Sequence, residues 1–244
     1  NVEIKYFKED IPRGTAGALL DNLKYLDHEF IVIYADIYFQ IDLKKFNNFF
    51  NKKKSKFALF VHPNDHPYDS DIIELNSKDE IIKVHNSPHN KLKFYQNIVN
   101  AALYIISKDC LHDVKSSFDK SDIAKDLIPF LLKRKVNLHG YKSTEYIKDM
   151  GTPYRLLQIE KDIKNKRVDR LNCNNQKCAV FLDRDGVINK EKGHISEISQ
   201  IQLIKGSAKA IREINKTGTL AICVTNQPVI ARGECSLENL KMIH

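Results

Sequence analysis

Short runs of β-branched and aromatic residues, several of them alternating with polar residues, recur through the first two thirds of the chain. Such runs favour extended backbone, because branched and aromatic side chains pack well on a pleated surface. They predict strands at residues 30–34, 56–61, 80–84 and 98–106. Apolar residues spaced three and four positions apart predict helices instead. These helices are expected at residues 15–26, 42–51, 121–134 and 153–164.

The helix expected at 121–134 carries two local signals. Ser121 stands at its start, and serine caps helices well because its hydroxyl accepts a hydrogen bond from a free backbone N–H. Pro129 lies inside it, and proline has no N–H to donate to the preceding turn. We therefore expect Ser121 as the N-cap and a kink or short break at Pro129.

After a polar stretch rich in Lys, Arg, Asn and Asp, the patterns typical of strands and helices recur in the last third of the chain. A buried-type strand is expected at 179–182, a helix at 206–217 and a second such strand at 220–224. Gly218 stands where a helix-ending glycine belongs. A strand, a helix and a strand with short connections predict an α/β unit with parallel strands.

The polar stretch is the best candidate for a domain boundary, because it has little apolar periodicity. We predict a first domain at 1–165, a linker at 166–177 and a second domain at 178–244. The expected fold class is α/β with two domains.

Composition narrows the class of protein. The chain has 244 residues, of which 42% are hydrophobic and 29% charged, an ordinary globular balance. No apolar run reaches the roughly 18 residues of a membrane span, so we expect no membrane partner. The formal net charge of +8 suits a protein that handles phosphorylated substrates, and we expect no nucleic-acid partner. The oligomeric state is left open.

Five cysteines form no regular disulfide framework. Cys173 and Cys178 could form half of a zinc site, but no second Cys/His pair follows at ligand spacing. Reduced thiols in a cytoplasmic protein are the expected state.

The strongest chemical signal is Asp183-Arg184-Asp185-Gly186 directly after the strand expected at 179–182. Carboxylates at the carboxyl end of a parallel strand face the crevice where α/β proteins bind ligands. Asp183 and Asp185 can together hold Mg²⁺, and one can attack phosphorus while the other acts as acid and base. A surface turn or a calcium-loop fragment is the alternative, but a calcium loop does not follow a buried strand.

The string Leu-Asp-Arg-Asp-Gly-Val-Ile-Asn resembles the haloacid-dehalogenase phosphatases, in particular the subgroup that acts on heptose bisphosphates and histidinol phosphate. The resemblance implies that Asp183 forms an aspartyl-phosphate and that Asp185 is the general acid/base. Val-Thr-Asn-Gln at 224–227 matches the second motif of that family. It implies the following phosphate-binding residues: Thr225, Asn226, Gln227 and Arg232. The continuation Pro-Val-Ile-Ala-Arg-Gly favours a heptose bisphosphate.

A loop of small residues near the start, Gly14-Thr15-Ala16-Gly17, leads into a helix. Its glycines allow close approach to a flat ligand, and a helix N-terminus offers free N–H donors. Simple helix capping by Thr15 is the alternative. Asp36 ends one apolar strand and Asp149 precedes a tight turn, so the two carboxylates could hold one Mg²⁺ on a nucleoside triphosphate.

These residues together resemble the sugar-1-phosphate nucleotidyltransferases. Pro-x-Gly-Thr-Ala-Gly-Ala-Leu implies a base-contacting loop made of Gly14, Thr15, Ala16 and Gly17. The resemblance implies that Asp36 and Asp149 are metal ligands, although Ala35 and Met150 replace the usual neighbours. It also implies that Asn100 contacts the sugar. The implied fold is Rossmann-like, with a mixed and mainly parallel sheet, followed by an incomplete haloacid-dehalogenase-like domain.

The Gly-Gly-x-Gly-Thr-Arg phosphate loop of the first family does not occur in the sequence. The third and fourth motifs of the second family, and its Cys/His zinc loop, would lie after His244. We therefore expect a piece of a longer protein, with any structural Zn²⁺ bound beyond His244.

The expected protein is bifunctional. It would remove one phosphate from a heptose 1,7-bisphosphate and transfer a nucleotide, with GTP as the expected donor, to the heptose 1-phosphate for surface polysaccharide. The alternatives are another sugar phosphate, histidinol phosphate, or a non-catalytic module that binds sugar nucleotides.

Overall fold

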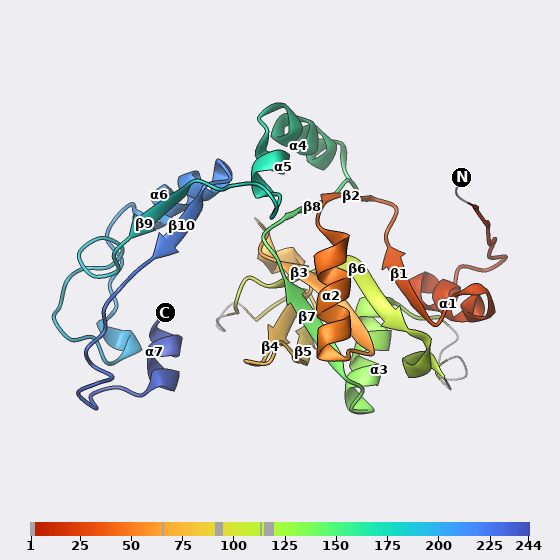
Figure 1. Ribbon diagram of the computed structural model, residues 1–244, viewed down its shortest axis with the longest axis horizontal. Helices are drawn as coiled ribbons and strands as arrows, with labels where there is room; N and C mark the ends of the chain where they lie inside the picture. The colour runs from red at the N-terminus through yellow and green to blue at the C-terminus, as the bar shows by residue number, and fades with distance from the viewer. Residues whose placement is uncertain (1–2, 65, 91–94, 113, 115–119) are drawn as a thin grey trace. The chain divides into compact units, whose positions relative to one another are not determined.

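The computed structural model describes residues 3–64, 66–90, 95–112, 114 and 120–244 (Figure 1). The chain forms two compact units, Asn1–Glu160 and Lys161–His244. Helix α4 (Pro153–Lys164) spans the division, and helix α5 (Arg167–Leu171) lies in the segment that we predicted as a linker. The domain limits themselves stay a prediction.

The first unit is built on a six-stranded sheet. Its strands are β1 (Glu29–Ile33), β3 (Phe57–His62), β4 (Ile72–Leu75), β5 (Ile81–His85), β6 (Val99–Ser107) and β7 (Leu138–Lys142). The predicted α/β class and mixed sheet are confirmed, and β1, β3, β4 and β7 run in one direction. Among the described strands of this sheet, β3 and β7 form the one parallel pair, because β6 lies between the other strands and runs antiparallel to them. Neighbouring strands are therefore mostly antiparallel.

A second, two-stranded sheet belongs to the same unit. It pairs β2 (Ile37–Gln40) with β8 (Tyr146–Asp149) in antiparallel register. Ile37 lies opposite Asp149, so the residue before β2 and the last residue of β8 lie at the same end of this sheet. That end carries both carboxylates of the expected metal site.

Helices cover both faces of the large sheet. Alternate side chains of a strand point to opposite faces, and β3 follows this rule. Phe57, Leu59 and Val61 pack in one apolar cluster with residues of α1 (Gly14–Asp21) and α3 (Ile128–Lys133). Ala58 and Phe60 pack in another cluster with α2 (Leu43–Lys53), which crosses one face of the sheet in Figure 1.

The four strands predicted in this unit are present as β1, β3, β5 and β6, each displaced by about one residue. The strands β2, β4, β7 and β8 were not predicted. β2, β4 and β8 have only four residues each, and β7 includes His139 and Gly140, which weaken its strand pattern. The helix expected at 15–26 ends earlier, at Asp21, and a 3₁₀ turn at Leu23–Tyr25 follows it.

The N-cap predicted at Ser121 is wrong, because Asp122 caps this helix. One Asp122 carboxylate oxygen accepts hydrogen bonds from the backbone N–H groups of Ala124 at 2.8 Å and Lys125 at 3.0 Å. The Ser121 hydroxyl is buried and has no hydrogen-bond partner in the part of the chain that the structure describes. The break expected at Pro129 takes the form of a π-helical turn, Ile123–Leu127, that changes to α-helix at Ile128. Pro129 thus lies in the first turn of α3, where its missing N–H costs little.

The second unit has the predicted strand, helix and strand. β9 (Ala179–Leu182) and β10 (Leu220–Cys223) are parallel, and α6 (Ser207–Lys216) connects them. Gly218 has a positive φ of 78°, as a helix-ending glycine should. Helix α7 (Leu237–Ile243) packs Leu240 against Val229 and Cys235.

Within the described ranges, none of the helices combines the length and the hydrophobicity that a bilayer crossing requires.

The assignment of Asp122 as the N-cap can be tested by substitution. Asp122→Ala removes the acceptor of two backbone N–H groups and should lower the free energy of unfolding by about 1–2 kcal/mol. Ser121→Ala removes a hydroxyl that has no partner and should leave it unchanged or slightly higher. Urea unfolding of both variants measures the difference. A larger loss in Ser121→Ala than in Asp122→Ala would contradict this assignment.

Candidate active sites

In the second unit, Asp183 directly follows β9, and Thr225 follows β10 after one residue. The Val224 N–H donates to the Leu182 carbonyl at 2.8 Å, which extends the parallel pairing to the ends of both strands. Because parallel strands end at the same edge of a sheet, the two following loops face each other there. The structure thus brings together the two predicted phosphatase motifs.

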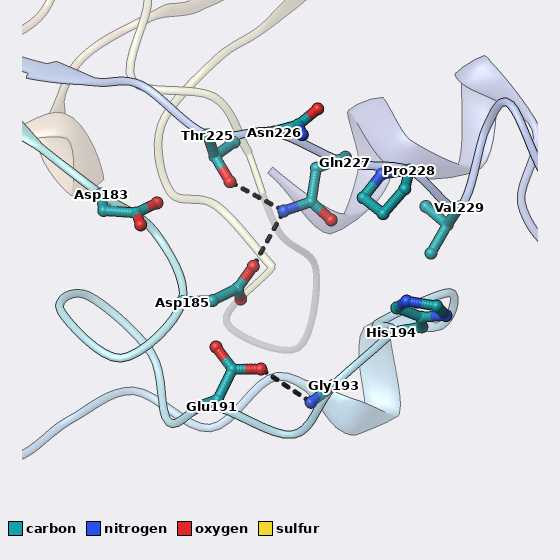
Figure 2. A pocket seen from close by; sticks show the side chains of 10 residues that line it. All are labelled: Asp183, Asp185, Glu191, Gly193, His194, Thr225, Asn226, Gln227, Pro228 and Val229. Atoms are coloured by element: carbon teal, nitrogen blue, oxygen red, sulfur yellow. Dashed lines mark hydrogen bonds between the residues drawn. The ribbon is translucent and has the colours of Figure 1, made fainter.

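These loops enclose a pocket of about 370 Å³ (Figure 2). The predicted residues among its lining side chains are Asp183, Asp185, Thr225, Asn226 and Gln227. The pocket is completed by Glu191, Gly193, His194, Pro228 and Val229. Arg232 does not line this pocket, and its guanidinium instead contacts the ring nitrogens of His194 at 3.1 and 2.9 Å.

The Asp185 carboxylate is fixed by hydrogen bonds from three neighbouring side chains. This carboxylate accepts hydrogen bonds from Nε and Nη2 of Arg184 at 3.1 and 2.8 Å, and from the Asn189 amide at 2.8 Å. The Gln227 amide donates to the same carboxylate at 2.8 Å and to the Thr225 hydroxyl at 2.7 Å, so it bridges the two motifs (Figure 2). Partial burial alone would raise the pKa of Asp185. The hydrogen bonds from Arg184, Asn189 and Gln227 outweigh it and lower this pKa below 3.8.

Asp183 has a different environment. Its side chain is exposed, and Oδ1 accepts a hydrogen bond from the Arg184 backbone N–H at 2.6 Å. The described contacts include no hydrogen bond to Oδ2. One carboxylate is thus accessible to a ligand, while the other is fixed by three side chains. Such a difference between neighbouring carboxylates suits two separate chemical roles.

Sequence reasoning missed Arg184 and Asn189, which contact Asp185, and also the pocket residues Glu191, Gly193, His194, Pro228 and Val229. Arg184 is only 5% exposed, and its guanidinium donates to the Asp185 carboxylate. Strand alternation would turn its side chain away from those of the two aspartates, but β9 has already ended at Leu182. Asn189 is 1% exposed, and its N–H donates to the Arg184 carbonyl at 3.0 Å. The sequence signal for Asn189 was its position four residues after Asp185, because a turn of that length can bring its side chain back to the Asp185 carboxylate.

In the first unit, the Gly14–Gly17 loop contacts protein rather than open space. Gly14 has a φ of +79°, and a Cβ there would lie 2.4 Å from the Ser121 carbonyl oxygen. The Ala16 N–H donates to the same carbonyl at 3.0 Å. Backbone approach at Gly14 therefore serves packing against the segment at Ser121. The predicted contact with a nucleotide base stays a prediction.

Thr15 does not cap its own helix, so the alternative reading of this loop is wrong. Arg13 occupies the N-cap position of α1 without a side-chain hydrogen bond. The Thr15 hydroxyl instead donates to Asp122 at 2.8 Å and accepts from the Ile123 N–H at 2.9 Å. These two hydrogen bonds join the Gly14–Gly17 loop to the helical segment that begins at Ile123.

Asp36 and Asp149 do lie near each other. A Cβ on Gly151 would lie 3.5 Å from one Asp149 carboxylate oxygen and 3.9 Å from one of Asp36, so both carboxylates border the same small space. The antiparallel pairing of β2 and β8 causes this, together with a hydrogen bond of 2.6 Å from the Met150 N–H to the Asp36 carbonyl. The guanidinium of Arg155 pairs with the Asp149 carboxylate.

Asn100 is already engaged within the protein. Its amide nitrogen donates to the Tyr104 hydroxyl at 2.9 Å, and its amide oxygen accepts from the Ala102 N–H at 3.1 Å. Within the described residues, these bonds use one N–H and one lone pair of the amide, which leaves its second N–H for a ligand.

No group of three or more His, Cys, Asp or Glu side chains gathers at metal-binding distance in the ranges that the structure describes. The first site offers the carboxylates of Asp36 and Asp149, and the pocket of the second unit offers those of Asp183, Asp185 and Glu191. Such sites suit Mg²⁺, which usually takes one or two carboxylates and completes its shell with water and substrate phosphate.

The comparison with known families agrees with the fold of the first unit. The nucleotidyl transferase family model matches residues 1–166, and the chain therefore belongs to that family. HddC from Yersinia pseudotuberculosis has a similar fold, with a TM-score of 0.53 at 23% identity over 64% of each chain. Bifunctional protein GlmU of Methanocaldococcus jannaschii is 29% identical over 167 residues, which are 67% of this chain and 38% of that protein.

A shorter part of the chain resembles a different class of enzyme. D-glycero-β-D-manno-heptose-1,7-bisphosphate 7-phosphatase of Pasteurella multocida is 49% identical over 57 residues, which are 23% of this chain and 31% of that protein. The chain spans about a third of the length of these curated relatives. Both resemblances indicated by the motifs are confirmed: the chain belongs to the nucleotidyl transferase family and continues into a segment similar to heptose-bisphosphate phosphatases.

The contacts of Asp185 lead to a prediction about its titration. The pKa of Asp185, followed by ¹³C NMR of its carboxyl group, should lie below 3.8 in the unchanged protein. Asn189→Ala should raise it, because the charged form loses a hydrogen-bond donor. Since the folded pKa is lowered, the stability that Asp185 contributes is present above pH 3.8 and is lost as the pH falls through the lowered pKa. Asn226→Ala, which changes a pocket side chain outside this network, is the control, and equal shifts in both variants would refute the explanation.

Proposed function

We propose that the protein performs two successive reactions on a heptose phosphate. The second unit removes the 7-phosphate of a heptose 1,7-bisphosphate, and the first unit then joins the heptose 1-phosphate to the nucleotide of GTP. The observation that carries the proposal is the pocket in which Asp183, Asp185 and Thr225 meet at the ends of β9 and β10. The product would serve surface polysaccharide synthesis, and the use of GTP fits the expected cytoplasmic location.

In the phosphatase reaction, Oδ2 of Asp183 attacks phosphorus and the bond to the sugar oxygen breaks. Asp185 gives the leaving oxygen its proton. It then takes a proton from the water that hydrolyses the aspartyl-phosphate, which restores Asp183 and releases phosphate. Asp185 is ionised in the free site because its pKa is lowered. An arriving phosphate dianion raises that pKa, and Asp185 can then take up the proton that it must donate.

The phosphate itself would be held by the second motif. The Thr225 hydroxyl and the Asn226 amide line the pocket opposite Asp183 and can donate to phosphate oxygens (Figure 2). The Gln227 amide nitrogen already bonds Asp185 and Thr225, so we assign it to fixing the acid/base rather than to the phosphate. Arg232 contacts His194 at the pocket wall, and its proposed phosphate contact requires a change of side-chain conformation.

In the nucleotidyl transfer, an oxygen of the sugar 1-phosphate attacks the α-phosphorus of GTP, and pyrophosphate leaves. The protein's part is to align the reacting groups. We propose that the Gly14–Gly17 loop holds the base and that the free N–H of Asn100 donates to the sugar.

Mg²⁺ fits both sites. Asp36 and Asp149 border one small space in the first unit, and Asp183 and Asp185 line one pocket in the second. These pairs would hold the ion, which would neutralise phosphate charge as the reactions proceed. Asp183 would be the main ligand in the second unit, because Asp185 would first have to release one of its hydrogen bonds to Arg184, Asn189 or Gln227.

Separate sites predict separable activities. Asp183→Asn in the full-length natural protein should reduce phosphate release from heptose 1,7-bisphosphate by at least about a thousandfold, because an amide is a poor nucleophile. Nucleotidyl transfer to supplied heptose 1-phosphate should remain unchanged. Phosphate release and nucleotide-sugar formation are assayed on the same preparation. Loss of both activities in a folded variant would refute the two-site proposal.

The reverse variant tests the first unit. Asp36→Asn or Asp149→Asn should reduce nucleotidyl transfer by about a hundredfold or more, since each removes a charge proposed to hold Mg²⁺. Phosphate release should not change. Asp27→Asn, an exposed aspartate that precedes β1, is the matched control. Transfer that persists in both site variants would exclude this carboxylate pair from the reaction.

A further inference from the structure

Arg155 pairs with one of the two carboxylates proposed to hold Mg²⁺ in the first unit. It lies in the first turn of α4, where its backbone N–H donates to the Thr152 hydroxyl at 3.2 Å. A short turn joins Asp149, at the end of β8, to this helix, so the long Arg155 side chain can reach back to the strand end. Its Nη1 donates to Oδ1 of Asp149. The Arg155 side chain is 29% exposed, so solvent screens the pair only in part.

The oxygen that Arg155 contacts is the one that an ion shared with Asp36 would need. A Cβ on Gly151 would lie 3.5 Å from Oδ1 of Asp149 and 3.9 Å from Oδ2 of Asp36, so these two oxygens border the same space. Oδ1 of Asp149 also accepts a hydrogen bond from the Gly151 N–H at 3.3 Å. A carboxylate oxygen has two lone pairs, and these two donors use both of them. Mg²⁺ must therefore displace a donor to bind Oδ1.

Arg155 is the donor that can leave. The Gly151 N–H is fixed in the backbone of the turn, whereas the guanidinium ends a long side chain and is repelled by a second positive charge on the same oxygen. Nη2 of Arg155 already lies 3.8 Å from Oδ2 of Asp69, which is close enough for attraction but too far for a hydrogen bond. The other Asp69 oxygen lies 2.9 Å from Nδ1 of His66, which helps to hold this carboxylate in place. A shift of about 1 Å would bring the guanidinium within hydrogen-bond distance of Asp69.

We infer that Arg155 exchanges Asp149 for a phosphate group of the bound nucleotide when Mg²⁺ takes that carboxylate. The inference rests on the proposed nucleotidyl transfer and adds a phosphate-binding residue to it. Two carboxylates that border one space repel each other, and Arg155 offsets part of this repulsion as long as it pairs with Asp149. Once released, its guanidinium lies beside the ion and can donate two parallel N–H groups to phosphate oxygens.

Calorimetric titration with Mg²⁺ alone tests the competition for Asp149. Every sample is the full-length natural protein with Asp183→Asn, because this change removes the main proposed ligand of the second unit. Arg155→Ala in this background should lower the Kd of Mg²⁺ about two- to fivefold, which is the range expected from the loss of one ion pair near the surface. A residue that merely held Asp149 in position would give the opposite sign, since its loss would weaken ion binding.

Binding of a non-hydrolysable GTP analogue at saturating Mg²⁺ tests the contact with phosphate. Arg155→Ala should raise the Kd of the analogue about tenfold, because a charged donor to phosphate is lost. Arg155→Lys keeps the charge but not the two parallel donors. It should therefore restore the Kd of Mg²⁺ and recover only part of the affinity for the analogue.

Arg167→Ala is the matched control for the loss of an ion pair. Arg167 pairs with Asp162 at 3.1 Å, and its side chain is 29% exposed, as is that of Arg155. This variant should leave both Kd values unchanged. Circular dichroism confirms that each variant is folded at the titration temperature.

The outcomes distinguish the inference from the function on which it rests. If Asp36→Asn in the same background leaves Mg²⁺ binding unchanged, or if the GTP analogue does not bind the unchanged protein, the proposed nucleotidyl-transfer site is wrong and the inference falls with it. If Asp36→Asn weakens Mg²⁺ binding but Arg155→Ala does not tighten it, the inference alone is wrong. The same conclusion follows if the GTP analogue binds equally well with and without the Arg155 side chain.

Discussion

The burial of β3 on both faces is the constraint on which the first unit depends. Its residues from Phe57 to Val61 are all 0% exposed. A strand that is apolar on both sides needs a layer of helices on each side. α1 and α3 supply one layer and α2 the other. This arrangement brings the Gly14–Gly17 loop, at the start of α1, to the same face of the sheet as Tyr34 and Tyr104.

In the second unit, two carboxylates two residues apart are made chemically different by their neighbours. Asp185 is surrounded by the guanidinium of Arg184 and the amides of Asn189 and Gln227. Within the described part of the chain, Asp183 accepts a hydrogen bond from one backbone N–H, on one oxygen. Because the fixed carboxylate also bonds Gln227, which bonds Thr225, the loops after β9 and β10 are joined before any ligand arrives. The site is in this sense prearranged by hydrogen bonds within the protein.

The sequence was sufficient wherever one local pattern determined the structure. The two aspartates after a buried strand, and Thr225 after the next, were predicted to share an edge of the sheet, and they line one pocket. Four strands of the first unit were predicted in the same way. What could not be predicted depended on partners far away along the chain. Thr15 bonds Asp122 more than a hundred residues later, and no local pattern indicates that contact. The cap at Asp122 was missed for a smaller reason, since Ser121 beside it is an equally good capping type.

The close approach at Gly14 bears on how relatives of this chain should be compared. The Ser121 carbonyl occupies the place where any larger residue would put its first side-chain atom. Packing alone therefore requires glycine at this position, whichever nucleotide the loop meets. A glycine kept at this position in related chains would therefore reflect the contact between the backbone segments at Gly14 and Ser121. Evidence about base preference has to be sought at neighbouring positions whose side chains are free to vary.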